Sequence, residues 1–293
     1  MSIYDSKRPL PDPETIRALS IDLDGTMLAP GAVLSERTAR TLKLCMQRGL
    51  RVIIATGRAV EAAEPFRAAI GATGPMIYYN GAVVMDTPGN KILNTVLMDK
   101  KAAEYCLDLA GEMGVYCQIY FPNEISPDGD KESSIPLLAN RVSAELDMYH
   151  KNTGILAEHA NLKEELSRPD LPGCVKTMFL VEPELVAVLR TKLEKHFGTN
   201  AYIATSHPMY LEVMHPKASK GSGLEFVMQH CSLKKEEIIA FGDEENDLPM
   251  FKASGFSIAL GSAKEEVKAA ADLVIGSNAE DGVAAFLEEY FKL

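Results

Sequence analysis

The most informative stretch for the fold is Ala18-Leu-Ser-Ile-Asp-Leu-Asp-Gly-Thr26. A short apolar run leads directly into two aspartates and a glycine, which is typical of a buried strand that stops at a turn. Alternate side chains of a strand share one side, so Asp22 and Asp24 are expected together, with Leu23 opposite. Two carboxylates this close repel each other, and a bound cation would relieve the repulsion. Alone, the stretch fits equally well a strand followed by an ordinary Asx-type turn.

The residues that follow continue the same architecture. A helix is expected over 35–48, with Ser35 capping its start, and an apolar strand over 50–55. Strand, helix and strand within about 40 residues form a βαβ unit, which predicts a parallel sheet. A further helix near 59–70 and a strand near 76–79 extend the alternation.

The pattern changes after about residue 85 and returns after about residue 217. Between these points strands are expected over 91–98, 115–121, 175–181, 201–204 and 209–214, helices over 100–113 and 184–197, and a loop over 122–136, while 137–174 fits no clear pattern. After them, helices are expected over 219–230, 248–253, 264–271 and 282–291, and strands over 238–241, 256–260 and 273–275.

This order predicts an α/β fold with a doubly wound, mostly parallel, Rossmann-like core and an inserted α+β unit. We expect the core to comprise residues 15–85 and 216–293, and the insertion to comprise 86–215. Residues 1–14 are expected to form an irregular arm because prolines recur in them.

Composition excludes several classes of protein. The 293 residues carry 30 basic and 41 acidic side chains, a net charge of −11, which argues against a nucleic-acid binder. The five cysteines include no Cys-x-x-Cys pair, which favours reduced thiols and a cytoplasmic location. No run of about 18 apolar residues exists, so no membrane span is expected. Oligomeric state cannot be read from the sequence.

Polar clusters follow the expected strands or precede a helix. Carboxyl ends of parallel strands meet at one crevice, so clusters far apart in sequence should converge there. Asp243 would then join Asp22 and Asp24 as a third carboxylate. Oxygen ligands of this kind suit Mg²⁺, and no cluster of His and Cys suggests zinc.

A second set of polar residues suits a phosphate group. Thr56 and the backbone at Gly57 could donate hydrogen bonds to phosphate oxygens, and Lys220 stands at a helix start, where an anion would offset its charge. Asn246 could donate to phosphate, and Asp247 could orient Lys220 or a metal-bound water. Taken singly, Thr56-Gly57 also fits an ordinary turn and Lys220 a solvated lysine.

Together, these clusters resemble the haloacid dehalogenase superfamily of phosphatases. Its four motifs correspond here to Asp22-x-Asp24-x-Thr26, Thr56, Lys220 and Gly242-Asp243-x-x-x-Asp247. The insertion is similar to a C2-type cap, and Asn80-Gly81-Ala82 resembles the Cof-type, or IIB, branch. Gly261-Ser262-Ala263 departs from the Gly-Asn-Ala of that branch, and 122–174 aligns with nothing in it.

The resemblance implies a role for each residue. Asp22 would be the nucleophile that forms an aspartyl-phosphate, and Asp24 the acid and later the base. Phosphate would be gripped by Thr56, Gly57, Lys220 and Asn246, and Mg²⁺ held by Asp22, the backbone carbonyl of Asp24, and Asp243, with Asp247 behind them.

The resemblance also implies an activity. The expected function is a Mg²⁺-dependent phosphomonoesterase acting on small phosphorylated metabolites, with sugar phosphates the leading class. A phosphotransferase or mutase would share the same motifs, because a phospho-aspartate can pass its group to a sugar hydroxyl. A non-enzymatic metabolite sensor would be favoured by loss of the acidic residues, and all of them are present.

Overall fold

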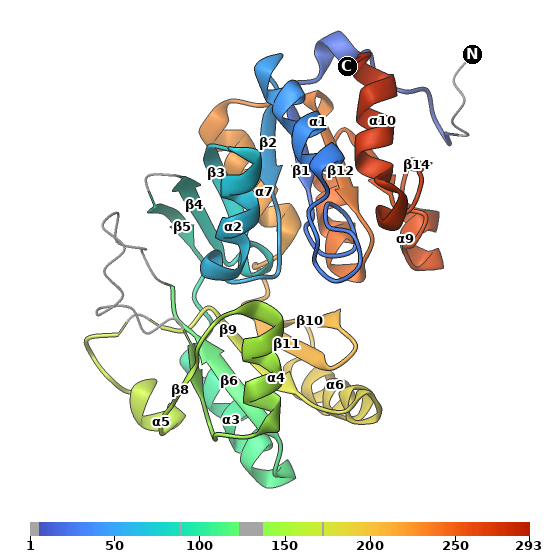
Figure 1. The fold of residues 1–293 in the computed structure, drawn as a ribbon. Coiled ribbons are helices and arrows are strands. Elements are labelled where there is room, and N and C mark those ends of the chain that lie inside the picture. The colour runs from blue at the N-terminus through green and yellow to red at the C-terminus, as the bar shows by residue number, and fades with distance from the viewer. Residues whose placement is uncertain (1–5, 88–89, 123–136, 172) are drawn as a thin grey trace. The chain divides into compact units, whose positions relative to one another are not determined.

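The computed structural model describes residues 6–87, 90–122, 137–171 and 173–293 (Figure 1). The chain divides into two compact units. One comprises Met1–Pro88 and Ser219–Leu293, here called the core unit, and the other comprises Gly89–Ala218, here called the cap unit. The domain boundaries after residues 85 and 215 stay a prediction.

The core unit is built on a five-stranded sheet with the order β14-β13-β12-β1-β2, in which every pair is parallel. Each of the longer strands is mostly apolar and almost fully buried, as parallel strands covered by helices require. The strands are β1 (Ala18–Ile21), β2 (Arg51–Ile54), β12 (Ile238–Gly242), β13 (Phe256–Ala259) and β14 (Leu273–Val274).

Helices cover both faces of this sheet, so the α/β, doubly wound fold expected from the sequence is confirmed. In Figure 1, α1, α2 and α10 lie in front of the strands and α7 lies behind them. The helices are α1 (Glu36–Gln47), α2 (Val60–Ile70), α7 (Lys220–Cys231), α8 (Leu248–Ala253), α9 (Glu265–Ala270) and α10 (Gly282–Phe291). Short 3-10 turns are η1 (Pro13–Thr15), η2 (Tyr79–Gly81), η4 (Lys235–Glu237), η5 (Glu245–Asp247) and η6 (Asn278–Glu280).

One hairpin of the core unit was not predicted. β3 (Gly74–Tyr78) continues the sheet beyond β2 through a parallel bridge between Ala55 and Ile77. The chain then reverses at Tyr79–Gly81, and β4 (Val83–Thr87) pairs with β3 in antiparallel fashion. Asn80-Gly81 is a strong hairpin signal, because both residues tolerate the positive φ angles that a tight reversal needs.

The cap unit contains a six-stranded sheet with the order β10-β11-β9-β6-β7-β8. All described pairs are antiparallel except β7 with β8. Its strands are β6 (Tyr116–Tyr120), β7 (Leu137–Ala139), β8 (Glu158–His159), β9 (Lys176–Leu180), β10 (Tyr202–His207) and β11 (Tyr210–Met214), and β5 (Lys91–Thr95) precedes them in the chain. Its helices are α3 (Lys100–Met113), α4 (Ala144–Thr153), α5 (Leu162–Glu165) and α6 (Pro183–Phe197).

The two faces of the cap sheet differ in chemistry. Side chains such as Ile119, Phe179 and Val213 join residues of α3 and α6 in an apolar core. The opposite side-chain set of the same strands carries a buried ion pair, in which Lys176 Nζ lies 2.6 Å from Glu212 Oε1. Within 137–174, where the sequence fits no clear pattern, the structure places β7, α4, β8 and α5. The loop expected over 122–136 lies outside the described residues apart from Pro122.

Candidate active site

The acidic residues gather at the carboxyl ends of the two central strands. Asp22 directly follows β1 and Asp243 directly follows β12, and these strands are neighbours in register. The chain leaves β1 toward β2 and leaves β12 toward β13, in opposite directions across the sheet. Such a switch in strand order opens a crevice at the strand ends, which is where α/β proteins bind ligands.

Lys220 connects two of the carboxylates. It is the first residue of α7, whose start is fixed by a reciprocal capping box between Ser219 and Ser222. Its Nζ lies 2.5 Å from Asp22 Oδ1 and 2.7 Å from Asp247 Oδ1, and its side chain is only 1% exposed. Burial alone would lower the pKa of Lys220, but the charges and hydrogen bonds of the two aspartates raise it above its ordinary value. The site therefore holds a permanent ammonium between two carboxylates.

The three carboxylates carry more negative charge than Lys220 balances. Asp22, Asp243 and Asp247 each offer an oxygen within 4.8 Å of the others. Burial raises the pKa of Asp22 well above its usual range, and the neighbouring carboxylates add to that shift although Lys220 opposes it. Burial and the charge of Asp247 likewise raise the pKa of Asp243 to about 7. A divalent cation would remove this repulsion, so the chemistry of the donor set fits one.

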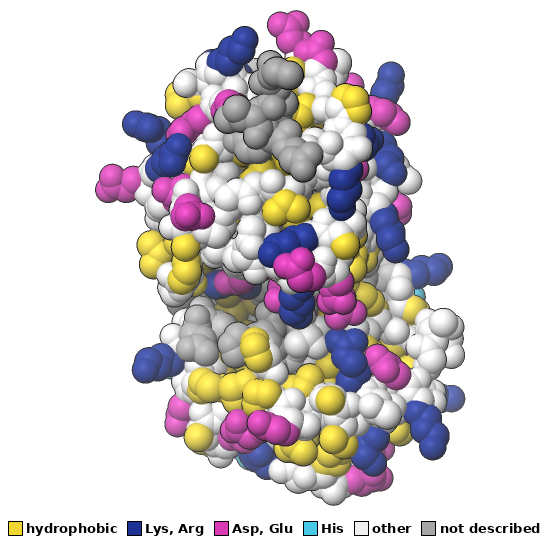
Figure 2. Space-filling view, turned by 90° about the vertical axis from the view of Figure 1, so that its right-hand side faces the viewer, with side chains coloured by type: hydrophobic (Ala, Val, Ile, Leu, Met, Phe, Trp, Pro, Cys, Tyr) yellow, Lys and Arg dark blue, Asp and Glu magenta, His cyan; other side chains and the backbone are white. Residues whose placement is uncertain are grey.

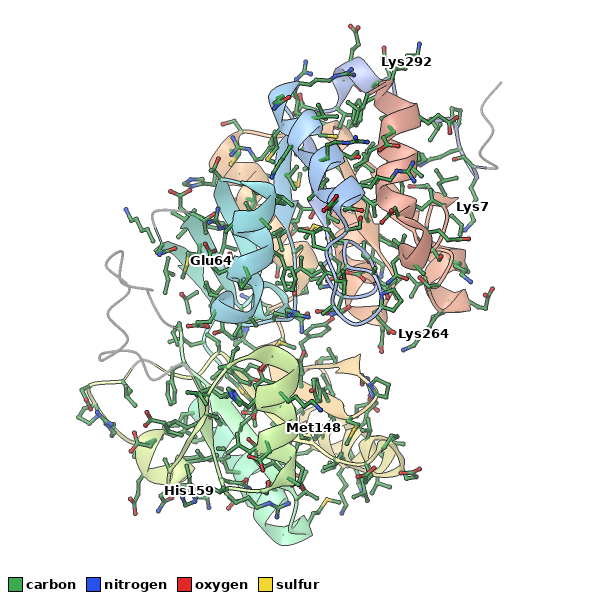
Figure 3. The ribbon with its side chains drawn as sticks, in the orientation of Figure 1. Lys7, Glu64, Met148, His159, Lys264 and Lys292 are labelled. Carbon is green, nitrogen blue, oxygen red and sulfur yellow. The ribbon has the colours of Figure 1, made fainter. Side chains whose placement is uncertain are left out.

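Asp247 has a different role from its two neighbours. Its Oδ1 accepts from Lys220, and its Oδ2 accepts the backbone N–H groups of Asp243 at 2.9 Å and of Glu244 at 3.0 Å. Both oxygens are thus already engaged, which leaves Asp22 and Asp243 better able to face a cation. Glu244 itself pairs at 2.7 Å with Lys264, which Figure 3 labels at the start of α9.

Asp243 is also held by the turn after β1. Thr26 Oγ1 donates to Asp243 Oδ1 at 2.6 Å. Gly25, at φ +80°, runs so close that a Cβ there would lie 2.0 Å from Asp243 Oδ2. Glycine is required at this position both for its backbone conformation and for the close approach.

This close approach gives a matched pair of variants. Gly25→Ala and Gly31→Ala both force alanine to φ +80°, at a cost of about 1–2 kcal/mol. Nothing lies within 4 Å of a Cβ at Gly31, whereas at Gly25 it displaces the Asp243 carboxylate. We expect similar thermal stability losses but a fall in turnover of about 100-fold only for Gly25→Ala, as misplaced site groups typically give. Equal turnover in the two variants would contradict this reading of Gly25.

The side chain of Asp24 does not join the acidic cluster. It is 48% exposed and forms a two-pronged ion pair with Arg58, with distances of 2.6 and 2.7 Å. Arg58 is braced in turn by the carbonyl of Ala62 at 3.2 Å and by the ring of Phe66, 5.1 Å from the guanidinium carbon to the ring centre. This pairing could not be predicted, because neither residue type nor spacing distinguishes Arg58 from a solvated arginine.

The expected phosphate-binding residues lie around the same strand ends. Thr56 is 1% exposed, its backbone N–H donates to Ile77, and its hydroxyl accepts from the N–H of Arg58 at 3.1 Å. Asn246 is 4% exposed, and its Nδ2 donates to Asn80 Oδ1 at 2.9 Å. Sequence reasoning gave Asn80 no role at the site. Ser262, at the departure from the Cof-type pattern, donates instead to Asn278.

Comparison with known proteins decides the family. Residues 19–287 match the family described as haloacid dehalogenase-like hydrolase. The chain belongs to this family. The predicted kinship with the Cof-type, IIB phosphatases is confirmed, and this haloacid dehalogenase-like hydrolase is an enzyme of the phosphatase type.

Relatives and solved structures match nearly the whole of the hydrolase. The pyridoxal phosphate phosphatase YbhA of Escherichia coli is 26% identical over 292 residues, covering 93% of this chain and 98% of its own. The HMP-PP phosphatase of Serratia proteamaculans is 28% identical over 278 residues, covering 94% and 96%. The subclass IIB sugar phosphatase BT4131 shares the fold, with a TM-score of 0.79 at 19% identity, covering 94% and 100%.

Among the described residues of the hydrolase, no helix combines the length and the apolar character needed to cross a bilayer.

Proposed function

We propose that this hydrolase is a Mg²⁺-dependent phosphomonoesterase that releases phosphate from small phosphorylated metabolites, foremost sugar phosphates. One observation carries the proposal: the buried Lys220 holds the Asp22 carboxylate 2.5 Å away, beside two further carboxylates at the switch point of the sheet. A carboxylate fixed between an ammonium and a cation site is suited to attack phosphorus, because the two positive charges would neutralise the ester and favour the ionised nucleophile.

The first half of the reaction transfers the phosphoryl group to the protein. An Asp22 oxygen attacks phosphorus, the phosphorus–oxygen ester bond breaks, and its electrons stay on the leaving alcohol oxygen. Asp24 donates a proton to that oxygen. The phosphoryl oxygens are bound by four groups: the Lys220 ammonium, the Thr56 hydroxyl, the backbone N–H of Gly57 and the Asn246 carboxamide. Asp24 has to leave Arg58 before it can reach the leaving oxygen, because both of its carboxylate oxygens accept from the guanidinium.

The second half hydrolyses the aspartyl-phosphate. Asp24, now ionised, takes a proton from water as the water attacks phosphorus. The acyl-phosphate bond breaks, and Asp22 is regenerated as a carboxylate with release of inorganic phosphate. One residue serves as acid and then as base because the proton lost in the first step is recovered in the second.

Mg²⁺ would be held by the side chains of Asp22 and Asp243 and the backbone carbonyl of Asp24. When bound, it supplies positive charge against the developing charge on the transferred phosphoryl group. Asp247 keeps Lys220 and the turn at Asp243 in position for it through the hydrogen bonds described above.

The substrate class is supported by kinship and by surface charge. The two curated relatives are named for pyridoxal phosphate and for HMP-PP, both small phosphorylated compounds. On the face drawn in Figure 2, described Lys and Arg side chains are interspersed with Asp and Glu instead of forming one basic surface. Phosphate neutralisation along a nucleic acid needs such a surface. A small metabolite in the cytoplasm remains the predicted substrate.

A panel assay with metal control tests the proposal. Phosphate release is measured from hexose and pentose phosphates, nucleoside monophosphates and pyridoxal phosphate, after treatment with EDTA and again after added Mg²⁺. We expect hydrolysis of some esters, loss of activity in EDTA and recovery with Mg²⁺, because the acidic cluster needs a cation. Chromatography of the products separates hydrolysis from transfer, since a mutase yields an isomeric sugar phosphate. Turnover that survives complete chelation would contradict metal dependence.

A further inference from the structure

The turn between β3 and β4 is buried and adopts an unusual backbone. Tyr79, Asn80 and Gly81 have φ angles of 49°, 53° and 93°, three left-handed residues in succession. The Asn80 side chain is 0% exposed. Left-handed backbone is disfavoured for residues other than glycine, and Asn is among the few that accept it. Contacts around the turn must therefore hold it in place.

The Tyr79–Gly81 turn contacts the two segments that carry Thr56 and Lys220. The Asn80 N–H donates to the Thr56 carbonyl at 2.9 Å. On the other side, a Cβ at Gly81 would lie 1.9 Å from the backbone oxygen of Ser219, the capping residue directly before Lys220. Residues Tyr79–Gly81 are thus packed between the loop after β2 and the N-terminus of α7.

The Asn80 side chain reaches a third part of the site. Its Oδ1 accepts the Nδ2–H of Asn246 at 2.9 Å. The same oxygen would lie 3.0 Å from a Cβ at Gly57, so the Gly57 backbone passes directly beside it. Asn246 Oδ1 is buried and has no hydrogen-bond partner within the described part of the chain. The second Nδ2–H and Oδ1 of Asn246 are therefore the two groups that could bind a ligand.

We infer that Asn80 is a positioning residue, which fixes the Asn246 carboxamide so that its second N–H faces the bound phosphoryl group. The inference rests on the proposed function, because it requires phosphate at the Lys220 end of the crevice. A carboxamide can turn over and exchange its donor and acceptor. If it turned, a carbonyl oxygen would face the phosphate oxygens and repel them. With Asn80 Oδ1 facing Asn246, as it does here, this acceptor selects the donating orientation of the Asn246 carboxamide.

The first test removes the acceptor and keeps the backbone. In Asn80→Gly, glycine adopts φ 53° freely, but nothing holds Asn246 Nδ2. Asn90→Gly is the matched control, since Asn90 is also left-handed, at φ 49°, outside the site. Binding of inorganic phosphate with Mg²⁺ present is measured by calorimetry. We expect about tenfold weaker binding in Asn80→Gly, equivalent to roughly 1.4 kcal/mol, and none of this loss in Asn90→Gly.

The second test asks whether Asn80 acts through Asn246. Asn246→Ala and the double variant complete a thermodynamic cycle, and we expect Asn80→Gly to add no further loss once Asn246 is alanine. Asn80→Asp keeps an acceptor oxygen and adds a charge, so its effect is expected to persist in the Asn246→Ala background. If Asn80→Gly is unstable, its phosphate binding is measured at a lower temperature, because any other residue without an acceptor would be more strained at φ 53°.

The outcomes separate this inference from the function on which it rests. If wild type neither binds phosphate nor hydrolyses any ester, both the phosphatase function and the positioning role of Asn80 are contradicted. If wild type does both and Asn80→Gly binds phosphate normally, or if the losses of Asn80→Gly and Asn246→Ala multiply, the positioning role is overturned and the phosphatase stands.

Discussion

Asp22→Asn is expected to lose phosphatase turnover by about 10⁴-fold or more, the usual effect of deleting a nucleophile that works in a concerted set. The same variant is expected to be more stable than wild type when metal is absent. The raised pKa of Asp22 means that its charged form is disfavoured in the folded protein. Asparagine is neutral at every pH and nearly the same shape, and Lys220 keeps its contact with Asp247.

Stability and turnover of Asp22→Asn are therefore expected to move in opposite directions. Relief of about 1 kcal/mol of burial cost and carboxylate repulsion raises the melting temperature by roughly 2–4 °C in a domain of this size. Thermal unfolding in EDTA measures this. Asp108→Asn, in the cap unit, is the control: its ion pair with Lys163 is exposed on both sides, so its loss should leave turnover unchanged and stability nearly so. A melting temperature below that of wild type, in a folded protein, would mean that the pair with Lys220 outweighs the repulsion.

Lys220→Met is expected to destabilise the protein by about 3–5 kcal/mol, because removing one partner of a buried ion pair leaves the other charge uncompensated. Here two carboxylates lose their common partner, and Asp243 lies beside them. Turnover should vanish as well, since the phosphoryl group loses its principal positive contact within the protein. Chemical unfolding and phosphate release measure the two effects.

A second substitution distinguishes charge imbalance from lost packing. Lys220→Met combined with Asp22→Asn should be more stable than Lys220→Met alone, because one uncompensated carboxylate is gone. Lys43→Met, on an exposed position of α1, controls for the substitution itself and should be nearly neutral. If the double variant is less stable than Lys220→Met, lost packing rather than charge explains the effect.

Sequence patterns predicted the parts of the fold that local chemistry determines. The strands β1, β2 and β12 are mostly apolar and buried apart from Arg51 at the start of β2, and α3 begins and ends at the predicted residues. The secondary structure of 137–174 could not be predicted, because its strands and helices are too short for a hydrophobic periodicity to be recognised. Strand β4 was not predicted, although Asn80-Gly81 is a sequence typical of a hairpin turn.

The predicted site residues depended on convergence that no single motif establishes. Asp22, Asp243 and Lys220 lie together because the strand order and the start of α7 bring them there. The partners Arg58 and Asn80 could not be recognised, because their importance comes from what their side chains reach: Asp24 in one case and Asn246 in the other. In the sequence, Arg58 looks like any arginine after a turn, and Asn80 looks like any asparagine before a glycine.

The central place of β1 has a consequence for how the protein is made. β1 pairs with β2 on one side and with β12 on the other, residue Ala18 facing Ile238. A ribosome adding roughly 5–20 residues per second completes that second partner about 10–45 s after it makes β1. During this interval the nascent chain has an apolar strand with one open edge, while the whole of Gly89–Ala218 emerges and can fold. Synthesis therefore leaves one edge of β1, the strand directly before Asp22, without its partner until β12 is made, and this open apolar edge is a natural point for chaperone binding.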